Sequence, residues 1–164
     1  MIRTFLEKRR VRREFEKLVA PEKVESLLRD CIERQPLKHG RIEFVLAFVR
    51  GETPAQVSER MARVADVAVA NGAAVHNVVG ALVIVAFGTH PASSPESGSR
   101  PSLVRALREE LAGDVKIVHG AADGHYGLFG SKTRMSYSFL VPEFDSILGA
   151  LSRLPFGQVE EFRG

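Results

Sequence analysis

The chain has 164 residues and a net charge of +3, and 45% of its residues are hydrophobic and 26% charged. This length suits one domain with a substantial hydrophobic core, and this composition excludes a largely disordered protein. The single cysteine, Cys31, excludes an intramolecular disulfide, and no apolar stretch resembles a signal peptide or a membrane span. We therefore expect a cytoplasmic protein.

Basic residues gather near the start of the chain. Residues 1–17 carry seven basic and three acidic side chains, a net charge of +4, which leaves −1 for the remainder. The run from Lys8 to Arg13 could contact nucleic acid or an anionic membrane, but no aromatic residue is interleaved for base stacking. We interpret the run as a solvated helix face and expect no nucleic-acid partner.

Two helices are predicted ahead of the main domain. The first covers residues 2–20 and has a thin apolar seam, so it would need a partner helix or the domain body to be stable. The second begins near Pro21 and ends before Gln35-Pro36. We therefore divide the chain into an N-terminal helical lead, residues 1–38, and a domain over residues 39–164.

The domain is predicted to begin with a strand and a helix. Residues 41–50 are mainly apolar and indicate a central strand. Thr53, Pro54 and Gln56 then form an N-cap, a first-turn proline and a capping-box glutamine, and the helix stops at Asn71-Gly72. Met61 lies on its apolar face and is interpreted as core.

A hairpin is predicted from Gly72 to Gly88 and is the spine of the domain. Two apolar runs meet at Gly80-Ala81, and the second, Leu82 to Phe87, is unbroken. Unbroken apolar runs of this length indicate strands that are buried on both faces. Both strands of the hairpin are therefore expected in the middle of a sheet.

The second half of the chain is predicted to alternate in the same way. Residues 90–101 form a Pro- and Ser-rich loop, either a regulated or ligand-covering segment or a tolerated insertion. A helix over 102–112 follows, and then two strands, 115–121 and 125–129, around a turn at Asp123-Gly124. The remaining predicted elements are a strand over 135–140, a helix opened by Pro142 and an edge strand over 158–162. This order predicts an α+β domain of the ferredoxin-like, split βαβ class.

Standard catalytic devices are absent from the sequence. It has no phosphate-binding glycine loop with lysine, no paired cysteines and no histidine pair at helical spacing. Cys31 has no visible base or oxyanion site for nucleophilic chemistry. His119 and His125 flank the predicted turn, but two ligands without a third make a poor metal site.

The order of several short segments is similar to the catalytic domain of class III adenylate and guanylate cyclases, over nearly the whole chain. Residues 7–24 resemble the charged helix that leads into many bacterial cyclase domains, and Arg50-Gly51-Glu52-Thr53 resembles the turn after the first strand. Gly80 to Gly88 resembles the central hairpin, and Gly127 to Ser131 with Arg134 and Tyr137 resembles the following hairpin. Each match is weak alone, and their shared order and spacing carry the resemblance.

The resemblance assigns functional positions, and this chain departs from the family at every one. In the family two aspartates hold two divalent metals, and they fall on Phe48 and Ala81. The base-selecting lysine falls on Asn77 and a second selector near Pro142. The transition-state asparagine and arginine fall on Asp145 and Gly149.

These departures imply that cyclase chemistry is lost. An aromatic ring and a methyl group cannot ligate magnesium, and a carboxylate at Asp145 would repel a phosphate. Losing both metal ligands should cost on the order of several kcal/mol of transition-state stabilisation. The changes at Phe48 and Ala81 look coupled, as if core had filled a metal site, so neither metal nor cofactor is expected.

Phosphate or nucleotide binding could persist at Arg50, Gly51, Glu52 and Thr53, before a helix N-terminus. The alternative is a strand-to-helix turn kept for folding.

These considerations predict a catalytically inactive, dimerising or regulatory module in intracellular signalling. A homodimer is expected, and a cyclase or another signalling protein is the alternative partner. Two other functions stay open: an active Mg- or Mn-dependent cyclase with relocated acids at Glu52, Asp123 or Asp145, and a nucleotide or small-ligand sensor.

Overall fold

Six strands form one sheet in the computed structural model, which describes residues 37–89, 99–130 and 135–163. The strands are β1 (Lys38–Val49), β2 (Ala74–Val79), β3 (Leu82–Phe87), β4 (Val115–Gly130), β5 (Met135–Leu140) and β6 (Val159–Arg163). The helices predicted before residue 37 lie outside the described residues, and so do residues 90–98 of the loop predicted over 90–101. The end of that loop is helical, because α4 begins at Arg100.

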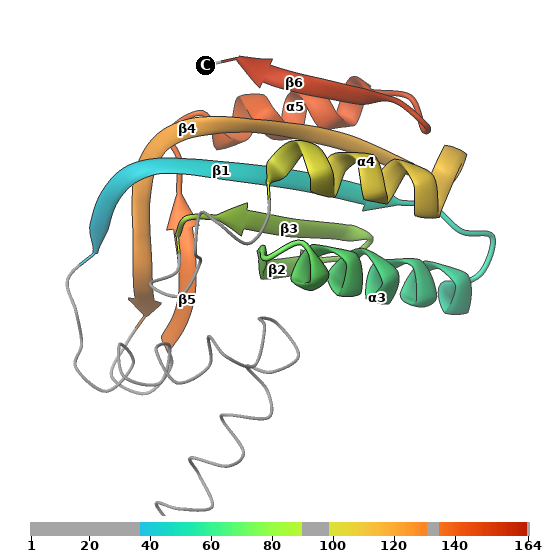
Figure 1. Cartoon of the computed structure of the whole chain (residues 1–164), viewed down its shortest axis with the longest axis horizontal. Helices are drawn as coiled ribbons and strands as arrows, with labels where there is room; N and C mark the ends of the chain where they lie inside the picture. Colours follow the sequence, from blue (N-terminus) through green and yellow to red (C-terminus); the bar gives the residue numbers. More distant parts are fainter. Residues whose placement is uncertain (1–36, 90–98, 131–134, 164) are drawn as a thin grey trace, which may run out of the picture.

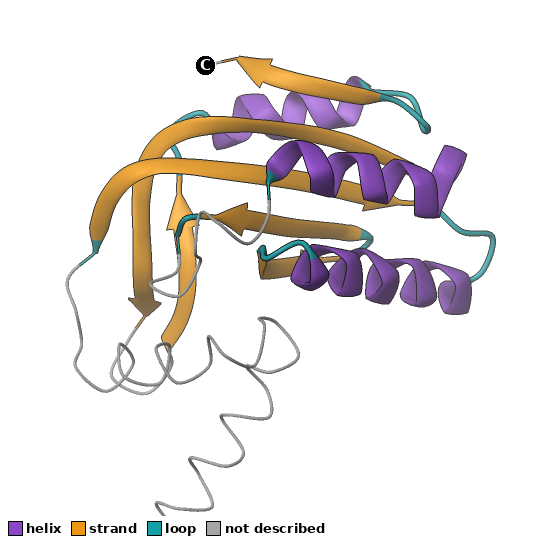
Figure 2. Cartoon of the chain, in the orientation of Figure 1, coloured by secondary structure: helices purple, strands orange, loops and turns teal. Residues whose placement is uncertain are grey.

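The order of the strands is β2-β3-β1-β4-β5, and β6 pairs with β4 as well. Neighbouring strands are antiparallel except for the parallel pair of β4 and β6. The helices α3 (Pro54–Ala70) and α4 (Arg100–Leu111) lie over one face of the sheet and α5 (Phe144–Arg153) over the other (Figure 1). This arrangement, coloured by element type in Figure 2, confirms the predicted α+β, split βαβ architecture.

Strand β1 divides the core into two clusters because successive side chains point to opposite faces. Val45, Ala47 and Val49 pack into the cluster under α3 and α4. Phe44 and Leu46 pack into the cluster under α5, and all five residues are at most 1% exposed. The first strand is therefore central, as predicted, although it begins earlier than residue 41.

Helix α3 begins as the sequence predicts. The Thr53 hydroxyl accepts a hydrogen bond from the Gln56 backbone N–H at 3.3 Å, and the Gln56 side chain accepts one from the Glu52 N–H at 2.8 Å. Pro54 occupies the first turn, where its missing N–H has no cost. Asn71 caps the other end.

The predicted hairpin around Gly80-Ala81 is present, but the position of one strand is corrected. Strand β3 is buried between β2 and β1, whereas β2 lies at the edge of the sheet. The second half of β2 is exposed, with Val78 at 45% and Val79 at 58%. An apolar sequence was therefore not sufficient to place β2 in the interior.

The prediction of a turn at Asp123-Gly124 is wrong. Residues 115–130 form one strand, β4, and Asp123 and Gly124 pair with Arg41 and Gly40 of β1. Continuous pairing along β1 outweighs the local preference of Asp-Gly for a turn. His119 and His125 consequently lie on the same strand and do not flank a turn, and the His125 ring instead contacts His39 at 4.9 Å between centroids.

Two smaller differences concern the end of the chain. The last helix begins at Phe144 rather than Pro142. The edge strand expected over 158–162 is present as β6, Val159–Arg163.

In the described residues, no helix is both long enough and apolar enough to span a membrane.

Candidate functional site

The end of β1 meets the β2–β3 turn, as the resemblance requires. The Val49 N–H donates to the Ala81 carbonyl at 3.0 Å, and Phe48 is in register with Leu82. The two positions to which the resemblance assigns metal-binding aspartates, 48 and 81, are thus close to one another across neighbouring strands. Their side chains are not coupled, however, because Phe48 packs against the cluster under α5 and Ala81 against the cluster under α3 and α4.

A lysine occupies the surroundings of Phe48. Lys116 of β4 is in register with Phe48, and its ammonium nitrogen lies 5.4 Å from the centroid of the Phe48 ring. The same nitrogen lies 5.4 Å from the Phe156 ring and donates to the Ser152 carbonyl at 3.3 Å. An ammonium group over aromatic rings is attracted by the negative charge of their faces. This end of the sheet therefore holds a fixed cation of the protein itself.

The turn from Arg50 to Thr53 is also engaged in internal contacts. The Arg50 guanidinium lies over the Phe156 ring at 4.9 Å, and its Nε donates to Asp114 Oδ1 at 3.0 Å. Asp114 also pairs with Arg60 at 2.6 Å. One carboxylate thus holds two arginines between β1 and α3.

The backbone of this turn is tightly packed. A Cβ atom on Gly51 would lie 2.9 Å from the Val57 nitrogen, so the position needs glycine. The Glu52 N–H is bound by Gln56, and Thr53 caps α3. Phosphate or nucleotide binding by Arg50, Gly51, Glu52 and Thr53 stays a prediction.

The other positions assigned by the resemblance lie on separate elements. Asn77 is exposed on β2, and its side-chain oxygen accepts from the Val78 N–H at 2.8 Å. Pro142 is exposed before α5, and Asp145 is exposed in the first turn of α5. Within the described part of the chain, no hydrogen bond, ion pair or ring contact joins these residues or Gly149 to Phe48 or Ala81.

An arginine lies near Gly149 although the sequence position itself is glycine. The Arg153 Nη1 atom lies 3.4 Å from the place where a Gly149 Cβ would be. The two residues are four apart on α5 and so share one helix face. This spacing could have been noticed in the sequence, whereas the contacts of Lys116, Asp114 and Phe156 required the register of distant strands.

A partly buried histidine precedes Asn77. Burial lowers the pKa of His76 from 6.5 to about 4, so its imidazole is neutral at physiological pH. Its Nε2 lies 2.9 Å from the Thr89 hydroxyl, and its ring meets Phe139 edge-on at 5.0 Å. His76 thereby links β2 to β5 across the sheet face.

Metal-binding chemistry has few donors in this region. Over residues 37–89, 99–130 and 135–163, no three histidine, cysteine, aspartate or glutamate residues cluster in a way that could hold a metal ion. Phe48 and Ala81 offer no ligand atoms, and the nearby Asp114 carboxylate is paired with Arg50 and Arg60. The residues present therefore do not fit the two-metal site that the resemblance implies.

Comparison with known proteins identifies the fold. No family model matches the sequence, and no curated protein matches it. Among solved structures, the adenylyl cyclase CyaB from P. aeruginosa has a TM-score of 0.62 and 16% identity, over 77% of this chain and 79% of that one. A bacterial light-regulated adenylyl cyclase has a TM-score of 0.69 and 14% identity, over 98% of this chain and 53% of that one.

A further similar structure is the dimeric guanylyl cyclase domain of the RhoGC fusion protein from the aquatic fungus Blastocladiella emersonii. Its TM-score is 0.61 with 11% identity, over 76% of this chain and 80% of that one. The chain therefore has the fold of adenylyl and guanylyl cyclase domains, as the sequence resemblance predicted. Identities this low establish the fold and do not transfer an activity.

Proposed function

We propose that this chain is a catalytically silent cyclase-fold domain that acts as a dimerising or regulatory module in intracellular signalling in the cytoplasm. The observation that carries the proposal is the Lys116 ammonium, which lies 5.4 Å from the Phe48 ring. Divalent metals that neutralise a triphosphate need anionic ligands at this place. The Phe48 side chain supplies no ligand atom, and the Lys116 ammonium beside it would repel a metal ion.

The positions of the acidic residues argue against an active cyclase with relocated ligands. Asp123 is in register with Arg41, seven residues before Phe48 on β1, so it lies about 24 Å from Phe48 along the strand. Asp114 binds Arg50, whose guanidinium group lies over the Phe156 ring. Its carboxylate is already paired with two arginines, Arg50 and Arg60. Glu52 and Asp145 are exposed and lie on different elements.

Two features favour pairing with a second protein chain. Strand β2 lies at the edge of the sheet, and Val78 and Val79 are exposed at its end. Exposed apolar side chains on an edge strand favour association. One structure of the same fold is a dimeric domain. We therefore propose a homodimer, with a cyclase or another signalling protein as the alternative partner.

The proposal is tested by incubating the full-length chain with Mn²⁺ or Mg²⁺ and ATP or GTP and measuring cyclic AMP and cyclic GMP. We expect no product above a protein-free control. Turnover that Asp145→Ala abolishes would show an active cyclase with a relocated acid and overturn the proposal. Light scattering on the same sample should give the mass of a dimer, and a monomer at all concentrations would contradict the dimer.

A further inference from the structure

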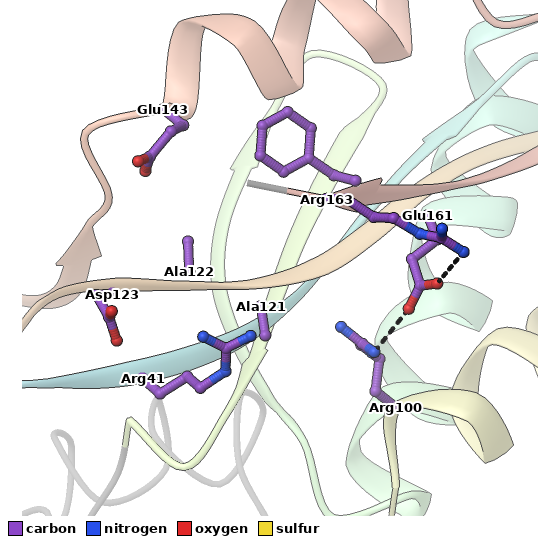
Figure 3. A pocket seen from close by; sticks show the side chains of 9 residues that line it. Arg41, Arg100, Ala121, Ala122, Asp123, Glu143, Glu161 and Arg163 are labelled. Carbon is purple, nitrogen blue, oxygen red and sulfur yellow. Dashed lines mark hydrogen bonds and ion pairs between the residues drawn. The ribbon is translucent and has the colours of Figure 1, made fainter.

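A cavity lies where the sheet divides, and the ligand that it would bind is independent of the proposed function. Strand β4 pairs with β6 as far as Ala121 and Arg163, and with β5 from His125 and Leu140 onwards. Residues 122–124 of β4 therefore face neither strand on this side. The cavity beside them measures about 370 Å³ and receives side chains from β1, β4, β6, the start of α4 and the turn before α5 (Figure 3).

The charged residues of this cavity are unevenly paired. Glu161 of β6 accepts from Arg100 at 3.1 Å and lies 3.7 Å from Arg163. This group of three carries a net charge of +1. Arg41 also lines the cavity and makes no ion pair with any described residue. Together with the group of three it gives a net charge of +2.

Arg100 is the least exposed member of the group. Its side chain is only 15% exposed, and its Nε is buried without a hydrogen-bond acceptor among the described residues. A buried donor without an acceptor lowers the stability of the fold. A guanidinium group has five N–H donors and usually donates hydrogen bonds to several oxygen atoms. In Figure 3 the guanidinium groups of Arg41 and Arg100 point towards one another across the cavity. Two cations in this arrangement favour an anionic group between them.

Neighbouring groups do not supply that anion. Glu161 is the carboxylate nearest to Arg100 and is shared with Arg163. His119, the other titratable group beside Arg100, supplies no negative charge in either protonation state. Burial and the Arg100 charge lower its pKa, against a smaller opposing effect of Glu161. Asp123 is in register with Arg41 on the neighbouring strand, but no ion pair joins their side chains. Among the described residues, Glu161 alone is paired with arginines of this cavity.

The other side of the cavity is acidic. Asp123 and Glu143 are exposed, and neither makes an ion pair with a described residue. Phe162 and Ala122 add apolar lining to the cavity, and in Figure 3 the Ala122 methyl group lies between Glu143 and Asp123. A polyanion such as a nucleoside triphosphate would be repelled by the two carboxylates, whereas a molecule with one charge of each sign would satisfy both sides.

We propose that this cavity binds a small zwitterion, with its carboxylate or phosphate between Arg41 and Arg100 and its ammonium group at Asp123 and Glu143. The volume equals that of about a dozen water molecules in the liquid, which suits a molecule the size of an amino acid or an amino-alcohol phosphate. The apolar lining residues, Ala121, Ala122 and Phe162, would contact the short carbon chain between the two charged groups of the ligand.

Calorimetry on the full-length chain tests the proposal with 5-aminopentanoate, lysine and phosphoethanolamine as probes. The single-charge analogues pentanoate and pentylamine and the polyanion ATP are the comparisons. At least one zwitterion should bind about tenfold more tightly than each single-charge analogue, because each charged end adds a charge-assisted hydrogen bond. The amino-acid and phosphate probes together identify the preferred anionic group.

The variant Arg41→Gln should weaken zwitterion binding about tenfold, since an exposed charged partner is removed without disturbing the core. The matched control is Arg105→Gln, which removes an exposed arginine of α4 that does not line this cavity. The proposal is overturned if no zwitterion binds at millimolar concentration, if pentanoate alone binds equally well, or if Arg41→Gln binds like the unaltered chain.

Discussion

The Lys116 ammonium lies 5.4 Å from the centroid of the Phe48 ring, at the end of β1 where the resemblance places a metal-binding aspartate. The Phe156 ring, 6.1 Å from that of Phe48, covers the same ammonium from another element. The place that the resemblance assigns to an aspartate therefore holds an aromatic ring that contacts a cation and a second ring.

The double substitution Phe48→Asp with Ala81→Asp should not restore cyclase activity. The carboxylate introduced at position 48 would meet the Lys116 ammonium before it could bind a metal, and Asn77, Asp145 and Gly149 remain unlike the family. Cyclic AMP and cyclic GMP formation with Mn²⁺ is the measurement. Product formed by the double variant and not by the unaltered chain would contradict this prediction.

Lys116→Met should lower the free energy of unfolding by about 1 kcal/mol, because the contacts with two rings and the bond to the Ser152 carbonyl are lost. Urea unfolding measures the change. The control Lys116→Arg keeps a cation over the rings and should lose less. Equal losses in the two variants would show that charge at this position is unimportant.

Stability should fall as the pH decreases from 6.5 towards 4, and His76 should account for part of this fall. The pKa of His76 is about 4 in the folded chain and about 6.5 when unfolded, so in this window only the unfolded chain takes up the proton. Its contribution is fully present above pH 6.5, and about 3 kcal/mol is lost by pH 4.

Denaturant unfolding at several pH values, with His76→Gln compared with the unaltered chain, measures this contribution. The variant should be less stable at pH 7 but should depend less steeply on pH, by up to about 1.4 kcal/mol per unit. Asn77→Gln, at the exposed next position of β2, is the control and should keep the original slope because neither side chain titrates. An unchanged slope in His76→Gln would show that its imidazole is not held neutral.

Gly124→Ala should destabilise the chain by about 3 kcal/mol, because the added Cβ would lie 2.3 Å from the Leu140 carbonyl oxygen and 2.9 Å from Ile42. This close approach lies at the point where β4 begins to pair with β5, at His125 and Leu140. Gly113→Ala, where no atom lies within 4 Å, should be nearly neutral in the same unfolding experiment. Similar stability of the two variants would be inconsistent with the close approach of β5.

Val79→Lys should weaken the proposed homodimer about tenfold, since a charge would replace a 58% exposed apolar side chain at the β2 edge. Light scattering or sedimentation over a concentration series measures the dissociation constant. Ala62→Lys adds the same charge on the exposed side of α3 and should leave the constant unchanged. If both variants dimerise equally, the β2 edge is not part of the interface.

Local sequence was sufficient for the elements whose signals lie within a few residues. Thr53, Pro54 and Gln56 determine the start of α3 because their capping bonds span only one turn. The Gly80-Ala81 turn between β2 and β3 likewise follows from two adjacent residues, with Gly80 at a φ of 59°. The assignment of the family's metal-binding aspartates to Phe48 and Ala81 rests on the sequence resemblance and stays a prediction.

The tertiary structure decided what depends on pairing between distant segments. Asp123-Gly124 forms part of a strand because β1 supplies partners before, at and after these two residues. Strand β2 is an edge strand because no further strand of the described residues pairs with it. Register also brings Lys116 to Phe48, 68 positions earlier in the chain, and Arg41 to the cavity beside Arg100. Such contacts have no local signature, because hydrogen bonds between strands join residues irrespective of their separation in sequence.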